Sequence, residues 1–322
     1  MFANRTTVRV AVAVVASGLL ATGAVALPAA ASTGVGTVNY SFRTLDNAND
    51  VTFNQLLGIN DEGLIAGYFG SGAQDHPNKG YLLLPRRAGS RYLNENFPGS
   101  VQTQVTGLNN RGVTVGFWSD TNNASLVNAN FGFYAVGGRF HTVNFPTDQN
   151  GTPPVNQLLG VNDQNIAVGF WTDAQGVNHG YEYHIRTNTF SPVLYTPAPQ
   201  ASVTATAINN EGEVAGFAMG ASSTVGFIRT RSGHITSLAF PGSSSTMALG
   251  INQYDEVVGT YTLGTSMHGF TWTPRAGFTT VDDPQGAGTT TINGVNEHGS
   301  LVGFYVDANG NTDGFLANPN RF

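Results

Sequence analysis

A ten-residue pattern occurs six times in this 322-residue chain and constrains its fold more than any other feature. The pattern is G/A-x-N-x-x-G/N/D-x-x-V/A-G, and successive copies of its asparagine are 43 to 53 residues apart. Its asparagines are Asn60, Asn109, Asn162, Asn209, Asn252 and Asn296. Repeats of about 40 to 50 residues are typical of β-propeller blades and longer than most helical repeats. The sequence therefore predicts a repeat protein of the propeller class.

The pattern also predicts a tight turn between two strands. Asparagine favours the first position of a type I turn, and the residue three places later must accept a positive φ. That residue is glycine in four copies and Asn165 or Asp255 in the other two. Asparagine and aspartate are among the few other residues that tolerate this left-handed backbone region, so the two exceptions support the turn.

Each repeat contains four runs with strand-like composition. In the fifth repeat they span 247–252, 256–261, 268–273 and 277–283, and no helical periodicity lies between them. The chain ends before the sixth repeat can form its fourth run, while an extra run of the same kind occupies 38–45. We therefore predict an all-β, six-bladed β-propeller of four-stranded blades, closed by an N-terminal strand that completes the last blade.

The first 31 residues have the layout of a secretory signal peptide. Arg5 and Arg9 precede an apolar run that ends in Leu27, and small residues follow up to Ser32. We expect residues 1–31 to be a cleaved signal and residues 32–322 to form a single secreted propeller domain. An uncleaved membrane anchor is the alternative for this run. No other segment is apolar enough to span a bilayer, so no membrane span is expected after cleavage.

Charge and cysteine content restrict the partners of the mature protein. Loss of Arg5 and Arg9 changes the formal net charge from -6 to -8. A chain this acidic is not expected to bind nucleic acid. The absence of cysteine leaves stability to the core and to closure of the fold. We expect a monomer.

The repeats resemble the HAF-repeat family of extracellular repeat proteins. The resemblance is carried by the Gly-Ile-Asn-Asp-Glu-Gly type of pattern followed by His268-Gly269-Phe270-Thr271-Trp272, and it covers nearly the whole mature chain. Glycine stands where the family has alanine in all six copies, and histidine precedes it only at His179 and His268. The resemblance implies export and a propeller-like fold, and it carries over no activity and no catalytic residues.

Residues that depart from the repeat on the face with long, variable loops are the candidates for binding. Trp118 and Asp120 in the second repeat match Trp171 and Asp173 in the third. Gln55, Gln104 and Gln157 occupy one equivalent position in the first three repeats. Aromatic rings with amides and carboxylates beside them can bind sugars. The alternative is that both tryptophans pack between blades and the polar residues cap strand ends.

A calcium-binding loop is a second candidate. Asp307, Asn309, Asn311 and Asp313 place oxygen-bearing side chains at alternate positions, as calcium loops do. The segment departs from the helix-flanked calcium loop in its glycine position and lacks the terminal glutamate. A tight polar hairpin without metal explains the same residues. No other cofactor is expected.

Three functions remain open at this point. The first is a secreted binding module for an extracellular glycan or protein partner. The second is a secreted carbohydrate-active enzyme, a glycoside hydrolase or polysaccharide lyase that uses carboxylates of the variable face. The third is a structural envelope protein. Because propellers host all three, whether the protein is an enzyme stays undecided and no catalytic residue is assigned.

Overall fold

The described residues of the computed structural model contain only β-structure. They are 38–87, 89–121, 130–146, 155–195 and 201–320, and they belong to one compact unit. The predicted signal peptide, residues 1–31, lies outside them. No helix in these ranges is long and apolar enough to cross a membrane.

The regular structure consists of strands β1 to β24, numbered in chain order. Their bounds are β1 Tyr40–Thr44, β2 Asn54–Ile59, β3 Ile65–Phe69, β4 Lys79–Leu84, β5 Arg91–Asn94, β6 Gln102–Leu108, β7 Val113–Ser119, β8 Phe131–Val136, β9 Arg139–Val143, β10 Val155–Val161, β11 Ile166–Thr172, β12 Asn178–His184, β13 Thr189–Pro192, β14 Ser202–Ile208, β15 Val214–Met219, β16 Thr224–Arg229, β17 Ile235–Leu238, β18 Ser245–Ile251, β19 Val257–Leu263, β20 Ser266–Thr273, β21 Gly277–Thr280, β22 Thr291–Val295, β23 Leu301–Val306 and β24 Thr312–Pro319.

These strands form four four-stranded sheets and one eight-stranded sheet. The sequence predicted six blades of four strands, and four of the observed sheets have this size while strands β14 to β21 are joined in one sheet. Strands β14 to β21 share one sheet because Thr224, at the start of β16, pairs in parallel with Ser245, at the start of β18. The Thr224 amide also donates a hydrogen bond to the carbonyl of Ser244 at 3.4 Å. The all-β propeller arrangement itself is confirmed.

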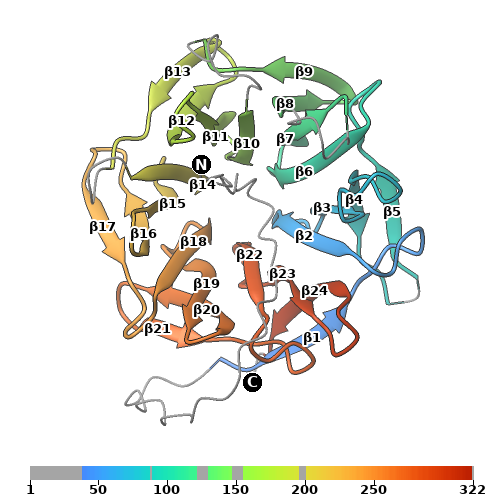
Figure 1. The fold of residues 1–322 in the computed structure, drawn as a ribbon, viewed down its shortest axis with the longest axis vertical. Helices are drawn as coiled ribbons and strands as arrows, with labels where there is room; N and C mark the ends of the chain where they lie inside the picture. Colours follow the sequence, from blue (N-terminus) through green and yellow to red (C-terminus); the bar gives the residue numbers. More distant parts are fainter. Residues whose placement is uncertain (1–37, 88, 122–129, 147–154, 196–200, 321–322) are drawn as a thin grey trace, which may run out of the picture. The chain divides into compact units, whose positions relative to one another are not determined.

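The first strand of each repeat lies at the centre of the arrangement. β2, β6, β10, β14, β18 and β22 each contact the next in this order, and β22 contacts β2 again. Figure 1 shows these strands around a central axis, with the later strands of each repeat farther out. Residues of all six inner strands line a cavity on this axis, which we call the central channel.

The two ends of the propeller chain meet in one sheet. β1 pairs antiparallel with β24, from Tyr40 opposite Pro319 to Thr44 opposite Phe315, in the sheet ordered β1-β24-β23-β22. Figure 1 shows this blue strand beside the red one. The predicted N-terminal closing strand is confirmed, and the outer edge of β24 is covered as a result.

The turns between first and second strands have the predicted backbone. Asn165 and Asp255 adopt φ values of 59° and 57°. The equivalent glycines, such as Gly63 at 78°, lie in the same region. We call the end of the propeller that carries these turns the Asn-turn face, and the opposite end the variable face. The antiparallel strand order places the connections between second and third strands, and those between repeats, on the variable face.

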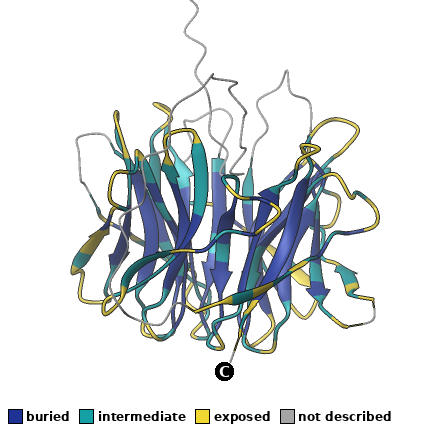
Figure 2. Cartoon of the chain, turned by 90° about the horizontal axis from the view of Figure 1, so that it is seen from below, coloured by how far each residue is buried: buried dark blue, intermediate teal, exposed yellow. Residues whose placement is uncertain are grey.

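The core lies between neighbouring sheets and depends on a glycine in each second strand. Figure 2 shows the inner strands largely buried and the loops at both ends exposed. A Cβ on Gly303 would lie 2.0 Å from the carbonyl oxygen of Thr291 and 2.8 Å from the ring of Phe315. Phe315 itself is fully buried. The glycine thus lets a large aromatic ring lie directly against the backbone of the strand.

We predict that Gly303→Ala destabilises the fold by about 3 kcal/mol or more, because the added methyl group overlaps backbone atoms that cannot move independently. Gly310→Ala is the matched control. Gly310 has a φ of 85° and open space around it, so its substitution is expected to cost only about 1 to 2 kcal/mol of left-handed strain. Urea unfolding of both variants measures the difference, and equal losses would contradict the packing role.

Candidate functional site

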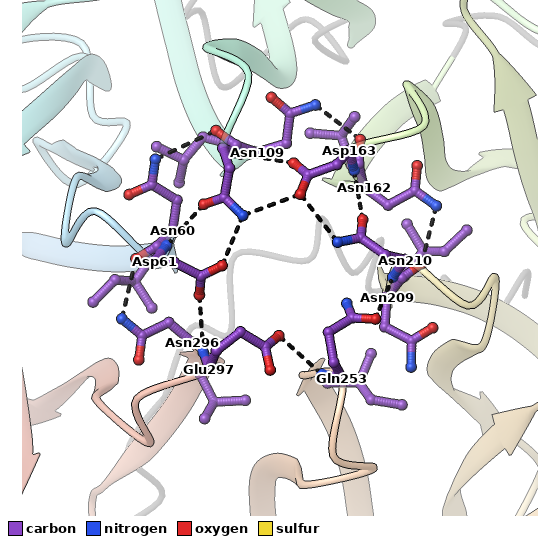
Figure 3. Close-up of a pocket in the computed structure, with 17 residues that line it drawn as sticks. Asn60, Asp61, Asn109, Asn162, Asp163, Asn209, Asn210, Gln253, Asn296 and Glu297 are labelled. Carbon is purple, nitrogen blue, oxygen red and sulfur yellow. Dashed lines mark hydrogen bonds between the residues drawn. The ribbon is translucent and has the colours of Figure 1, made fainter.

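The six Asn turns surround the mouth of the central channel on the Asn-turn face. They line a cavity of about 90 Å³ with asparagine, aspartate, glutamine and glutamate side chains, shown in Figure 3. The six signature asparagines are buried, between 2% and 6% exposed. Buried amides must find partners, so the site is best described by its hydrogen bonds.

The signature asparagines form a closed circle of hydrogen bonds. Each Nδ2 donates to the backbone carbonyl of the asparagine in the next repeat. The bonds run Asn60 to Asn109 at 3.4 Å, Asn109 to Asn162 at 2.8 Å, Asn162 to Asn209 at 3.0 Å, Asn209 to Asn252 at 3.3 Å, Asn252 to Asn296 at 3.2 Å and Asn296 to Asn60 at 3.1 Å. One side chain type thus connects every repeat to its neighbour.

The same asparagines also hold their own turns. The Oδ1 of Asn109 accepts the backbone N–H groups of Arg111 at 3.0 Å and Val113 at 2.9 Å. The Oδ1 of Asn162 accepts those of Gln164 and Ile166 in the same way. The amide therefore joins the local turn to the neighbouring repeat, which aspartate or alanine cannot do.

A second circle lies beside the first and uses the residue after each asparagine. Its backbone N–H donates to the side-chain oxygen of the equivalent residue in the next repeat. The bonds run Asp61 to Asn110 at 2.9 Å, Asn110 to Asp163 at 2.9 Å, Asp163 to Asn210 at 2.7 Å, Asn210 to Gln253 at 3.1 Å, Gln253 to Glu297 at 3.0 Å and Glu297 to Asp61 at 2.9 Å. The polar side chain at this position in all six repeats was the sequence signal for this circle, and our sequence analysis missed it.

Three members of the second circle are acids, and two of them are neighbours. Burial raises the pKa of Glu297 above its ordinary value, and the nearby charge of Asp61 raises it further. The hydrogen bond from the Gln253 amide acts in the opposite direction. The mouth of the channel therefore carries three carboxyl groups, and two of them, Glu297 and Asp61, are neighbours where the sixth repeat meets the first.

Behind the mouth, the channel is lined by apolar side chains from the odd repeats and hydrogen-bonding side chains from the even repeats. A second cavity of about 90 Å³ is lined there by Leu57, Leu159 and Leu249 from the odd repeats. The even repeats have hydrogen-bonding residues instead. Thr106 Oγ1 donates to the carbonyl of Leu158 at 2.7 Å, Thr206 Oγ1 to that of Ala248 at 2.9 Å, and Asn293 Nδ2 to that of Leu56 at 2.9 Å. These contacts add a third set of links between neighbouring repeats.

The two tryptophans predicted to bind a ligand lie against other aromatic rings. Trp118 stacks on Phe97 of the preceding repeat, with centroids 4.3 Å apart and planes 8° apart. Its other neighbour is Phe131, at 4.8 Å. Trp171 stacks on Phe145 in the same way, at 5.3 Å and 9°. These contacts favour the packing alternative for the indole rings, since the protein's own side chains occupy their stacking surfaces.

The two aspartates predicted beside them differ in their surroundings. Asp120 is exposed. Asp173 caps a tight turn, where its Oδ1 accepts the amides of Gln175 and Val177, both at 2.9 Å. Its Oδ2 lies 2.8 Å from Nε2 of His179. That imidazole in turn stacks on Trp171, with centroids 4.5 Å apart.

The three predicted glutamines are buried and serve contacts within the protein. Gln55 Oε1 accepts the hydroxyl of Tyr68 at 2.9 Å. Gln104 Nε2 donates to Asn78 at 2.9 Å, and Gln157 Nε2 donates to Asn130 at 2.7 Å. Asn78 and Asn130 precede the third strands of neighbouring repeats. Glutamine therefore recurs in repeats two and three for a structural reason, because its side chain forms a hydrogen bond to the preceding repeat.

The predicted calcium loop is a hairpin in which the carboxylate of Asp307 accepts hydrogen bonds from the loop itself. Asp307 Oδ1 accepts the amides of Asn309 and Asn311, both at 2.8 Å, and Oδ2 contacts the side chains of the same two residues. These bonds lower the pKa of Asp307. Asp313 belongs to β24 instead and is buried. The described ranges contain no group of three or more His, Asp or Glu side chains placed to hold a metal ion.

A His–Asp pair on an aromatic ring occurs twice on the variable face. In the fifth repeat, His268 Nδ1 lies 2.7 Å from Asp282 Oδ2, and its ring stacks on Tyr261 at 5.2 Å. His179 has a comparable pair, although Asp173 follows the second strand of its repeat and Asp282 follows the fourth. The side chain of His179 is 43% exposed, against 24% for His268. The sequence signal was the histidine before the third-strand glycine, which occurs only at these two positions.

Comparison with known proteins supports the fold. No protein-family model matches the chain, and no curated protein matches it. The chain is similar to the SapL1 lectin solved with alpha methyl fucoside, with a TM-score of 0.53 and 8% identity over 79% of this chain and 88% of that one. It is also similar to the Trypanosoma rangeli sialidase bound to the inhibitor DANA, with a TM-score of 0.50 and 9% identity over 86% and 57% of the two chains. The chain has a β-propeller fold. At these identities the likeness extends no further than the fold.

We predict that Asn109→Asp destabilises the protein by about 2 to 4 kcal/mol. The new carboxylate keeps the acceptor that holds the turn but presents an oxygen instead of a donor to the carbonyl of Asn162. Asn188→Asp is the control, because Asn188 accepts a hydroxyl from Tyr183 and its oxygen is retained. Thermal unfolding of both variants gives the comparison, and a loss of stability confined to Asn188→Asp would contradict the role of the circle.

We predict that Glu297→Gln makes stability less dependent on pH. A carboxyl whose pKa is raised on folding contributes stability that is present below its unfolded pKa and lost as pH rises through its folded pKa. Wild-type protein should therefore lose stability relative to Glu297→Gln between about pH 4 and 7, by up to about 1 kcal/mol for this partly exposed group. Denaturant titrations at both pH values measure the effect, with the exposed Glu62→Gln as control. The prediction would be refuted if the difference in stability between wild type and Glu297→Gln were the same at both pH values.

Proposed function

We propose that this protein is an exported six-bladed propeller that binds extracellular glycans at junctions between neighbouring blades on its variable face. The observation that carries the proposal is the half-exposed imidazole of His179. It is held in place by Asp173 at 2.8 Å and rests on Trp171 at 4.5 Å. The Tyr261, His268 and Asp282 arrangement supports the same interpretation.

We propose a count of six blades on the basis of how the eight-stranded sheet is joined. One parallel pair, Thr224 with Ser245, connects two antiparallel units of four strands. Isolated parallel bridges of the same kind link other neighbouring repeats, namely Phe53 with Thr312, Asn130 with Val155 and Met267 with Thr289, without merging their sheets. We therefore count β14–β17 and β18–β21 as two blades, which with the four separate sheets makes six.

The chemistry of this junction suits a polyhydroxylated ligand. An imidazole fixed by a carboxylate offers a hydrogen-bonding nitrogen and an aromatic surface at low cost in side-chain entropy. His179 uses Nε2 for Asp173, and its Nδ1 forms no hydrogen bond with another described residue. The Trp171 and Asp173 prediction is thus retained in a modified form, with the imidazole in place of the indole as the contacting group.

The repetition of the arrangement favours binding over catalysis. Two similar sites on one face allow one polysaccharide chain to be held at both, which raises avidity without a new contact. We also propose that residues 1–31 direct export and that the chain is a HAF-repeat protein, on the sequence patterns described above. A protein partner carrying such glycans would be recognised through the same sites.

We predict that Asp173→Asn and His179→Ala each weaken retention on the bound polysaccharide at least about tenfold, because the imidazole is no longer fixed or present. Asp307→Asn is the matched control, since Asp307 caps an equivalent hairpin turn that has no histidine. Retention on a polysaccharide panel is measured together with new reducing and unsaturated ends.

The outcomes separate the functions. Retention without new chain ends supports a binding module, and cleavage by the wild-type protein would support the enzyme alternative instead. Equal retention by Asp173→Asn, His179→Ala and Asp307→Asn would show that the ligand binds elsewhere. Absence of retention on every polysaccharide tested would contradict the glycan proposal for those substrates.

A further inference from the structure

Arginine residues are unevenly distributed over the propeller. Three of the ten arginines in the described ranges, Arg86, Arg87 and Arg91, lie within one short hairpin. This hairpin joins β4 to β5 and closes where Leu84 pairs with Arg91. It connects the third and fourth strands of the first repeat, so it lies at the outer edge of the propeller, at the opposite end from the variable face.

A fourth arginine reaches this hairpin from another blade. Arg43 lies in the closing strand β1, which belongs to the sheet of the sixth repeat. Figure 1 shows β1 next to the blade that contains β4 and β5. Arg43 Nη2 donates to the carbonyl of Arg86 at 2.6 Å and to Ser90 Oγ at 3.1 Å. The Arg43 side chain therefore lies against the backbone of the hairpin that carries the other three arginines.

No acidic residue in the described part of the chain pairs with these four arginines. All four are exposed, and none of them forms an ion pair with a carboxylate of a described residue. The acid nearest to Arg43 in the sequence is Asp46. Burial raises the pKa of Asp46 to about 6, and the charges that act on it are those of Asp313 and Asp307. The arginine group therefore keeps its positive charge unbalanced.

A structural role explains only one of the four arginines. The two hydrogen bonds of Arg43 join the closing strand to the first repeat, which accounts for its position. The side chains of Arg86, Arg87 and Arg91 form no hydrogen bond with a described residue. Like charges gathered in one hairpin repel one another, so their clustering costs stability unless an anion binds there.

The chemistry of the group suits a ligand with several closely spaced anionic groups. The planar guanidinium presents parallel N–H groups that pair with two oxygens of one oxyanion. Both hydrogen bonds of Arg43 use Nη2, so its Nε and Nη1 donors stay available. The chain as a whole has a formal net charge of -6, so a polyanion is repelled by most of the molecule and attracted by this group.

The surroundings favour a polysaccharide over a membrane or a protein as the anionic partner. Membrane-binding and protein-binding surfaces use apolar or aromatic anchors beside their charged residues. Several large hydrophobic side chains of the described residues are exposed, but none of them lies in the hairpin between β4 and β5. An anionic polysaccharide needs no apolar anchor, because its charged groups lie along a hydrated chain.

We propose that Arg43, Arg86, Arg87 and Arg91 form a binding surface for an anionic polysaccharide that carries sulfate or carboxylate groups. We call these four residues the arginine surface. It is separate from the glycan site on the variable face, and its ligand is selected by charge.

Binding of the whole purified protein to heparin and to polygalacturonate tests the proposal. Heparin supplies sulfate groups and polygalacturonate supplies carboxylates alone, so the two polymers distinguish the sources of negative charge. We expect the wild-type protein to bind at least one of them at low ionic strength and to lose affinity as salt is added. Failure to bind either polymer would overturn the proposal, as would binding that does not respond to salt.

A double variant and a matched control locate the binding surface. Arg86→Gln with Arg87→Gln removes two charges and keeps the backbone carbonyl that Arg43 contacts. We expect it to lower affinity for the bound polymer at least about tenfold, because charge-assisted hydrogen bonds are lost. Arg139→Gln with Arg275→Gln removes the same charge from exposed outer hairpins of the second and fifth repeats, and it should retain wild-type affinity.

The variants also give the results that would contradict the arginine surface. Wild-type affinity in Arg86→Gln with Arg87→Gln would overturn the proposal. Equal losses in both double variants would overturn it too, since only net charge would then matter. Binding to vesicles of anionic lipid, without binding to either polysaccharide, would assign the surface to a membrane instead. Melting temperatures of both double variants check that each one is folded.

Discussion

The circle of asparagine hydrogen bonds at the channel mouth is the constraint on which the rest of the structure depends. In a propeller, each sheet must be fixed against the next, and the last sheet must be fixed against the first. Here one asparagine amide per repeat makes both kinds of contact. Its oxygen holds the local turn, while its nitrogen bonds the next repeat at 2.8 to 3.4 Å. The circle closes because Asn296 reaches Asn60.

The two faces of the propeller differ in how far their residues repeat. On the Asn-turn face every repeat has an asparagine followed by a second polar residue, and the hydrogen bonds of both are mostly formed within the protein. On the variable face the junctions differ, with aromatic stacks at Trp118 and Trp171 and imidazole–carboxylate pairs at His179 and His268. Function is expected where the repeats differ, since a structural requirement shared by all repeats fixes the other face.

Local features of the fold could be predicted from the sequence, while contacts between repeats could not. The positive φ of Asn165 and Asp255 and the pairing of β1 with β24 follow from turn chemistry and from a missing strand. The stacking of Trp118 on Phe97 depends on how two sheets lie against each other, which no local pattern specifies. The same limit applies to the site, where His179 gains its role only through Trp171 and Asp173. The joining of β16 to β18 through Thr224 and Ser245 likewise depends on the spacing of two sheets.

A double-mutant cycle on opposite sides of the circle tests the central claim most directly. Asn162→Ala and Asn296→Ala remove equivalent side chains three repeats apart. Among the described residues, each Nδ2 bonds only the asparagine carbonyl of the next repeat. If the bonds act as one closed circle, the second substitution should cost at least about 1 kcal/mol less free energy of unfolding than the first. Distant independent sites add to within about 0.3 to 0.5 kcal/mol. Additivity within that range would contradict a circle that acts as a unit.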